Sequence, residues 1–204
     1  MKTNLSLIVA TLLCLAFGLS CNKTPSEPGD APVETKTSEK IGLAKEDVKA
    51  CVVYFSATGT TKAVAEKIAE ATDAQIFEII PKQIYTEDDL NYRDEKSRSS
   101  IETNDPNARP EIEGEPLDLS GFNVLYLGYP IWWGEAPKIL YTFVERQNFD
   151  GLIVVPFCTS GSSETAQSAI NLAKAAGSGK WLDGRRFDAK ADKQAVDSWI
   201  NEIQ

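Results

Sequence analysis

Apolar residues occur along the chain in short runs, and most runs are followed by a segment with helical spacing. The runs at 122–129 and 151–158 are almost continuously apolar, which is typical of strands buried on both faces of a parallel sheet. The other predicted strands are 50–55, 74–80 and a short edge strand at 185–187. The predicted helices are 60–72, 135–147, 162–176 and a last helix with Val196, Trp199, Ile200 and Ile203. This alternation predicts an α/β domain whose sheet is covered on both faces.

Two segments at the start of the chain do not fit this pattern. In residues 1–20, Lys2 precedes an apolar run that is shorter than the roughly 20 residues of a membrane span, which predicts a signal peptide. Residues 21–47 are rich in Pro, Glu, Lys, Thr and Ser, a composition that cannot bury enough apolar surface to fold. They are predicted to be a flexible tether to a domain at 48–204.

Cys21 directly follows the predicted cleavage position and is similar there to the acylation site of bacterial lipoproteins. The similarity implies a lipid anchor at Cys21 that holds the protein on a membrane of the bacterial cell envelope. Lipoproteins usually carry an aliphatic residue at the position of Gly18 and a small one at that of Leu19. Export to the periplasm, or secretion without an anchor, is therefore the alternative.

Residues 81–118 interrupt the alternation of strands and helices with many charges, scattered aromatic residues and the prolines Pro106, Pro110 and Pro116. A loop this long inside a compact domain is usually functional or disordered. We describe it below as the insertion.

Composition and charge narrow the classes of function. The chain has 204 residues and a formal net charge of −9, which argues against nucleic acid as a partner. It contains no histidine, which excludes acid–base catalysis through imidazole. Beyond Cys21 its cysteines are Cys51 and Cys158, so no metal site is expected. We expect a monomer.

The segment SATGTT, residues 56–61, joins the first predicted strand to its helix and offers hydroxyls and a glycine but no cation. Backbone N–H groups at a helix N-terminus, together with Ser and Thr hydroxyls, neutralise a phosphate through hydrogen bonds and the helix dipole. Gly59 would let the backbone approach such a ligand closely. The segment favours a phosphate site, and an ordinary helix N-cap is the alternative.

Two further loops follow buried strands at the edge of the predicted sheet where ligands bind. Trp132 and Trp133 lie in the first of them, and at least one indole must be near solvent unless something covers it. A flat aromatic ligand would cover it, and packing of both tryptophans on protein is the alternative. The second loop, 159–163, consists of Thr, Ser and Gly.

Residues 50–204 resemble the flavodoxin family, because SATGTT matches that family's phosphate loop of Thr or Ser, any residue, Thr, Gly, any residue, Thr. The stretch Pro-Ile-Trp-Trp-Gly at 130–134 looks like a bacterial flavodoxin-like subgroup that also carries a long insertion after the second strand. The resemblance implies a doubly wound, five-stranded parallel sheet of order 2-1-3-4-5 with helices on both faces. It also implies FMN as the cofactor. In that order a strand separates Cys51 from Cys158, so both are expected to be free thiols.

The resemblance further implies which residues contact FMN. The phosphate loop comprises Ser56, Ala57, Thr58, Gly59, Thr60 and Thr61. The isoalloxazine ring is expected between Pro130, Ile131, Trp132, Trp133 and Gly134 on one side and Thr159, Ser160, Gly161 and Ser163 on the other. Trp133 is expected to face the ring and Trp132 to pack on protein. Because 159–163 contains no aromatic residue, the flavin face there is expected to be open unless the insertion folds over it.

These features together imply an FMN-binding redox protein of the cell envelope that passes electrons to a partner protein or a small acceptor. A second hypothesis is that the protein is an NAD(P)H-dependent reductase of quinones or nitroaromatics. A third is a binder of another phosphorylated ligand without redox activity.

Overall fold

The computed structural model describes residues 39–204, which belong to one compact unit. The predicted signal peptide, Cys21 and the predicted tether up to residue 38 lie outside the described residues. The end of that tether packs on the domain, because Ile41 is buried and its amide donates to the carbonyl of Ile203 at 2.7 Å. A single 3₁₀ turn, η1 (Lys45–Asp47), then leads into the sheet. Within residues 39–204, no helix is long and apolar enough to cross a membrane.

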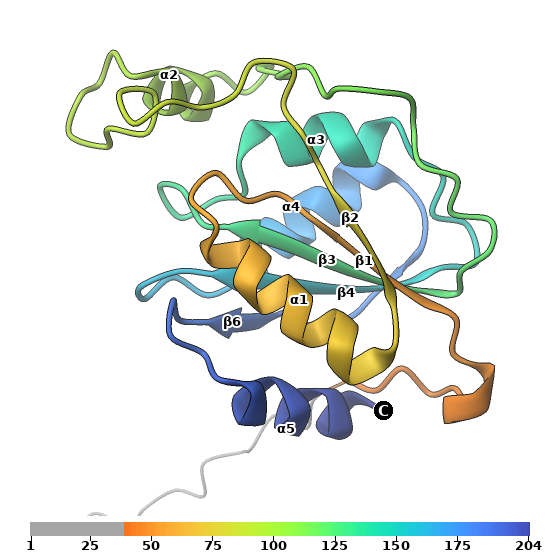
Figure 1. Cartoon of the computed structure of the whole chain (residues 1–204). Helices are drawn as coiled ribbons and strands as arrows, with labels where there is room; N and C mark the ends of the chain where they lie inside the picture. The colour runs from red at the N-terminus through yellow and green to blue at the C-terminus, as the bar shows by residue number, and fades with distance from the viewer. Residues whose placement is uncertain (1–38) are drawn as a thin grey trace, which may run out of the picture. The chain divides into compact units, whose positions relative to one another are not determined.

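A parallel sheet forms the centre of the domain (Figure 1). Its strands are β1 (Ala50–Tyr54), β2 (Gln75–Glu78), β3 (Val124–Pro130), β4 (Ile153–Thr159), β5 (Lys180–Trp181) and β6 (Arg185–Phe187). The order β2-β1-β3-β4-β5 confirms the predicted 2-1-3-4-5 winding. The fifth position is shared, because β5 pairs with the start of β4 and β6 pairs with its end. The sequence predicted only the second of these two short strands.

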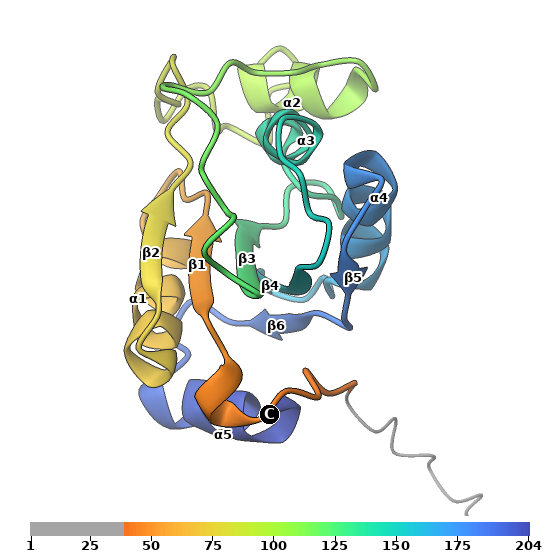
Figure 2. The same cartoon turned by 90° about the vertical axis from the view of Figure 1, so that its right-hand side faces the viewer.

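Helices cover both faces of the sheet (Figures 1 and 2). The helices α1 (Thr60–Thr72) and α5 (Lys193–Ile203) lie on one face, and α3 (Lys138–Glu145) and α4 (Ala166–Ala176) lie on the other. Side chains of β1 alternate between the two layers: Val52 belongs to the core beneath α1 and α5, whereas Val53 belongs to the core beneath α3 and α4. This period of two follows from the pleat of an extended strand.

The insertion at 81–118 contains a helix, α2 (Arg98–Asn104), that the sequence did not predict. Its two arms pair where they leave and rejoin the domain. The amide of Lys82 donates to the carbonyl of Glu111 at 2.9 Å, and the amide of Glu113 donates to the carbonyl of Ile80 at 2.8 Å. The insertion is therefore anchored at its base, and Figure 1 shows α2 at the opposite end of the picture from α5.

Cys51 in β1 and Cys158 in β4 are free, buried thiols, which confirms the prediction made for them. The strand β3 lies between the two strands that carry them. Burial raises the pKa of each thiol to about 12. Because the thiolate is the reactive form, neither cysteine is a nucleophile at neutral pH.

The packing of β3 on β4 requires a glycine at position 128. Gly128 pairs with Phe157, and a Cβ at Gly128 would lie 2.2 Å from Cζ of that ring. Since Phe157 is fully buried, the ring has no free space into which it could move. We predict that Gly128→Ala lowers the free energy of unfolding by about 1–3 kcal/mol or more.

Urea unfolding followed by circular dichroism measures this change. Gly121→Ala is the matched control, because a Cβ at Gly121 would meet no atom within 4 Å. The control should change the free energy of unfolding by less than about 0.5 kcal/mol. Equal unfolding midpoints for Gly128→Ala and the wild type would contradict the close packing described here.

Candidate functional site

The first loop, residues 56–61, joins β1 to α1 and leaves a set of hydrogen-bond donors unused. Gly59 is the N-cap of α1, with φ of 84°, and no side chain caps the helix. Within residues 39–204, the backbone amides of residues 57–62 donate to no acceptor. A Cβ on Gly59 would meet no atom within 4 Å, so the space beside it is open. This loop is not an ordinary side-chain N-cap, and its amides can bind an anion.

The hydroxyls of the first loop have different surroundings. Thr61 Oγ1 is buried 2.8 Å from Thr159 Oγ1, and this pair joins the first loop to the end of β4. Thr58 Oγ1 and Thr60 Oγ1 lie 3.3 Å apart near the surface. Ser56 Oγ is buried and has no hydrogen-bond partner in the described part of the chain. A ligand atom that paired with Ser56 would offset a desolvation cost of about 1–3 kcal/mol.

The second loop, after β3, is a tight turn at residues 132–135. Trp132 and Glu135 exchange two backbone hydrogen bonds of 2.9 Å, and this turn delays the start of α3 to Lys138. Trp133 and Gly134 occupy its central positions with φ of 49° and 80°. Two positive φ values characterise a type I′ turn, which normally carries Asn-Gly. Trp133 is thus held in the left-handed region, at a cost of about 1–2 kcal/mol.

The two tryptophans of this turn have different environments. Trp132 packs edge-on against Phe55 and Tyr85, with ring centroids 5.7 and 5.2 Å apart. It therefore packs on protein, as the sequence analysis expected. Trp133 is 47% exposed. A strained backbone beneath an uncovered aromatic side chain points to a role in binding, and contact of Trp133 with a ring stays a prediction.

The third loop, residues 159–163, is held by a cation from the edge of the sheet. Arg186 of β6 donates to the carbonyl of Ser160 at 3.2 Å and forms an ion pair with Glu164 at 3.2 Å. The Ser160 hydroxyl donates to the carbonyl of Ser163, which closes the loop on itself. Sequence reasoning did not single out Arg186, because its role depends on the pairing of β6 with β4.

Two cavities open beside these loops, and Thr58 lines both. The first has a volume of about 490 Å³ and the second of about 410 Å³. The first is lined by Thr58, Thr60, Pro130, Thr159, Ser160, Gly161, Asp188, Ala189 and Lys190. The second is lined by Thr58, Leu90, Tyr92, Ser99, Ile131, Trp132 and Trp133. The first cavity is therefore rich in hydroxyls, and the second is aromatic and aliphatic.

This arrangement separates two loops that the sequence analysis expected on either side of one ring. Trp132 and Trp133 line the second cavity, whereas the residues of the third loop line the first. The insertion borders the second cavity and not the first, so it does not fold over the third loop. The expected contact residues that line neither cavity are Ser56, Ala57, Gly59, Thr61, Gly134 and Ser163.

Two groups of lining residues were not predicted. Asp188, Ala189 and Lys190 follow β6, and the rule that ligands bind at the carboxyl ends of parallel strands could have identified them. Leu90, Tyr92 and Ser99 belong to the insertion. No sequence pattern indicated the path of the insertion, so no signal could have found these three.

A family model described as Flavodoxin matches residues 49–203. The chain belongs to the flavodoxin family. Two crystal structures of proteins assigned as flavoproteins are similar to it. The protein from Bacteroides uniformis is 40% identical with a TM-score of 0.72, and the match covers 76% of this chain and 98% of that one. The protein from Bacteroides eggerthii is 41% identical with a TM-score of 0.71, covering 77% of this chain and 98% of that one.

A more distant flavoprotein, from Lactobacillus acidophilus, was solved in complex with FMN. It is 22% identical with a TM-score of 0.55, and the match covers 74% of this chain and 98% of that one. At this identity the similarity shows a shared fold. The comparison with curated proteins finds no match.

The strain at Trp133 is open to a direct test. We predict that Trp133→Asn raises the free energy of unfolding of the ligand-free protein by about 1 kcal/mol, because Asn tolerates positive φ and gives the turn its preferred Asn-Gly pair. Trp132→Leu should instead lower it by about 1–3 kcal/mol, because it removes the contacts with Phe55 and Tyr85. Urea titration of both variants measures the difference. A loss of stability in Trp133→Asn would mean that the packing of this indole outweighs its backbone strain.

Proposed function

We propose that the protein binds FMN and transfers electrons through it to a redox partner protein or a small acceptor. The observation that carries this proposal is the pair of cavities that share Thr58. One offers hydroxyls at a helix N-terminus, and the other offers aromatic side chains. A ligand that fills both carries a phosphate at one end and a flat ring at the other, and FMN has this form.

The phosphate fits the first loop without a cation within that loop. The unpaired amides of residues 57–62 and the positive end of the α1 dipole would bind its charge, and Thr58 and Thr60 would donate to its oxygens. Ser56 is the buried hydroxyl that still lacks a partner. Lys190 is the cation among the residues that line the first cavity, and Asp188 lines it as well.

The ring fits the second cavity, where Trp133 is exposed on a turn that fixes its position. When bound, the flavin would supply the electron-transfer chemistry, because it accepts and releases one or two electrons. The chain's residues would hold the ring, limit its contact with water and set the surrounding charge. The net charge of −9 would disfavour a reduced flavin that carries a negative charge.

The proposed phosphate site predicts different affinities for FMN and for riboflavin, which lacks the phosphate. We predict that the wild type binds FMN far more tightly than riboflavin, and that Thr58→Val with Thr60→Val weakens FMN much more than riboflavin. Each hydrogen bond lost to a phosphate oxygen costs about 1–3 kcal/mol, or roughly one to two powers of ten in Kd. Quenching of flavin fluorescence during titration measures both affinities.

Thr142→Val is the matched control, because Thr142 lies in α3 and its buried hydroxyl already lacks a partner. It should leave both affinities unchanged. Equal affinity of the wild type for FMN and riboflavin would overturn the phosphate site. Electron transfer is tested by anaerobic reduction of the FMN-loaded protein with dithionite, followed by oxidised cytochrome c. If bound reduced flavin fails to reduce the cytochrome, the protein binds FMN without carrying electrons to this acceptor.

We further propose that the protein acts in the bacterial cell envelope, anchored by a lipid on Cys21. The support is the sequence pattern of residues 1–21, in which an apolar run ends just before a cysteine. Two or more acyl chains on this cysteine would hold the acidic domain at a membrane surface, whereas a single chain binds only marginally.

Cys21→Ser should release the protein from the membrane fraction or block its processing, because serine provides no thiol for acylation. Cell fractionation with an antibody against the domain measures this. Cys14→Ser is the matched control, since Cys14 lies within the predicted signal peptide, and it should leave the fractionation unchanged. Mature wild-type protein in the soluble fraction would favour export without an anchor.

A further inference from the structure

We propose that Tyr92, from the insertion, contacts the isoalloxazine ring of FMN and supplies the aromatic side chain that the 159–163 loop lacks. This inference rests on the function proposed above. It makes the insertion part of the cofactor site, and it places the ring beside the insertion rather than beside the third loop.

The geometry of the second cavity is the first observation. Tyr92 and Leu90 line it from the insertion, and Trp133 lines it from the turn after β3. Tyr92 is 68% exposed and Trp133 is 47% exposed, so two large aromatic side chains border one cavity without being covered. Uncovered aromatic surface around a concave site is typical of a binding site for an apolar ring.

The chemistry of the lining is the second observation. No charged side chain lines this cavity, and its polar groups are the hydroxyls of Thr58, Tyr92 and Ser99 and the indole N–H groups. The Arg93 guanidinium lies 5.5 Å from the centre of the Tyr92 ring but does not line the cavity. A flat and largely uncharged ring would find stacking partners among the lining residues, whereas a phosphate would find no charged one. The first cavity differs, because hydroxyls and the charged residues Asp188 and Lys190 line it and no aromatic residue does. The phosphate of FMN therefore fits the first cavity, and its ring fits the second.

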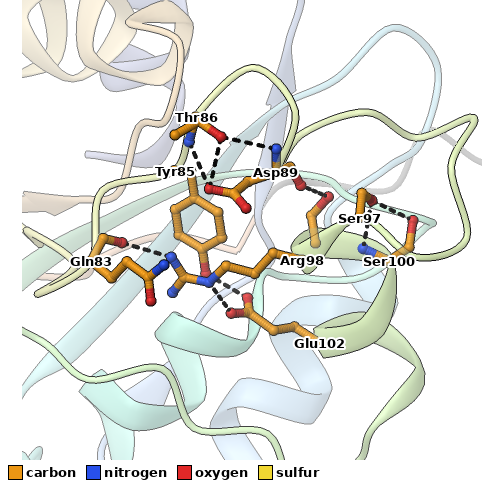
Figure 3. A network of polar contacts seen from close by, with 9 residues as sticks. Gln83, Tyr85, Thr86, Asp89, Ser97, Arg98, Ser100 and Glu102 are labelled. Atoms are coloured by element: carbon orange, nitrogen blue, oxygen red, sulfur yellow. Dashed lines mark hydrogen bonds and ion pairs between the residues drawn. The ribbon is translucent and has the colours of Figure 1, made fainter.

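The rigidity of the insertion is the third observation. Figure 3 shows a polar network that joins residues 83–89 to residues 97–102, and these two segments precede and follow Tyr92 in the sequence. Ser99 donates to the carbonyl of Asp89 through its amide at 3.0 Å and its hydroxyl at 2.6 Å, and the Asp89 carboxylate accepts from the amide and hydroxyl of Thr86. The Asp94 amide donates to the carbonyl of Asn91 at 3.0 Å, which closes a turn around Tyr92.

The same network connects the insertion to the tryptophan turn. Glu102 accepts from the Tyr85 hydroxyl at 2.5 Å and from Arg98 Nε at 2.6 Å, and the Arg98 guanidinium lies 4.0 Å from the centre of the Tyr85 ring (Figure 3). Burial and Glu102 raise the pKa of Tyr85, so its hydroxyl keeps its proton and donates at any physiological pH. The Tyr85 ring in turn packs on Trp132. Both aromatic walls of the cavity are thus attached to one rigid cluster.

The experiment compares FMN and riboflavin in Tyr92→Ala, Tyr92→Phe and Thr60→Val. Because Tyr92 would touch the ring and not the phosphate, Tyr92→Ala should weaken both ligands by the same factor, about 2- to 12-fold. Tyr92→Phe keeps the stacking surface and should bind both ligands like the wild type. Thr60→Val, at a residue that lines only the first cavity, should weaken FMN and leave riboflavin unchanged. The visible absorption bands of the bound flavin should shift in Tyr92→Ala and not in Tyr92→Phe.

Folding does not obscure the result, because Tyr92 is largely exposed and its truncation removes no core packing. If the wild type binds FMN and Tyr92→Ala leaves both affinities and the spectrum unchanged, the inference is overturned while the proposed function stands. If Tyr92→Ala weakens FMN but not riboflavin, Tyr92 acts at the phosphate end and the inference is again overturned. If the wild type binds no FMN, the proposed function itself fails.

Discussion

The parallel pairing of β1, β3 and β4 is the constraint on which the site depends. Their register aligns Tyr54, Gly128 and Phe157 across the sheet, and the three loops leave the sheet just beyond this row. The strands β3 and β4 can pair closely here because Gly128 has no side chain, and the Phe157 ring occupies the space where one would lie. The hydrogen bond between Thr61 and Thr159 then joins the first helix to the end of β4. The positions of the phosphate loop and of the tryptophan turn therefore both follow from core packing.

Residues that directly follow these paired strands also position the insertion. The Tyr85 ring packs on Phe55, which follows β1, and on Trp132, which follows β3. A bidentate ion pair between Arg109 and Glu145, with contacts of 2.7 Å, ties the returning arm of the insertion to α3. Arg109 also lowers the pKa of Glu145, so this carboxylate stays ionised well below neutral pH. These contacts hold the insertion in a fixed position and do not indicate a movable lid.

The sequence was informative where local pattern and tertiary packing agree. The helix at 60–72 was predicted because its helical spacing directly reflects burial. The continuous apolar runs indicated a parallel sheet covered on both faces, whereas the winding order was implied by the resemblance to the flavodoxin family. The helix α2 was missed because it has no apolar face, and its residue Ile101 is exposed. The Ser97 cap and the partly buried Arg98–Glu102 pair stabilise it instead. The second cavity could not be foreseen, since it depends on how the insertion packs. Trp133 occupies a position with positive φ where this type of turn normally carries Asn. Such conflicts between the local preference of the backbone and the residue present tend to mark functional positions.

The two buried thiols give this protein an internal reporter of its own fluctuations. Because burial keeps Cys51 and Cys158 protonated, a thiol reagent can modify them only after the surrounding structure opens. Cys51 lies in β1, between two neighbouring strands, whereas Cys158 lies in β4 beside the short strand β6 at the edge of the sheet. The labelling rate of Cys51 therefore reports opening of the centre of the sheet, and that of Cys158 reports opening of its divided edge. The difference between the two rates therefore shows how much more often the edge of the sheet opens than its centre.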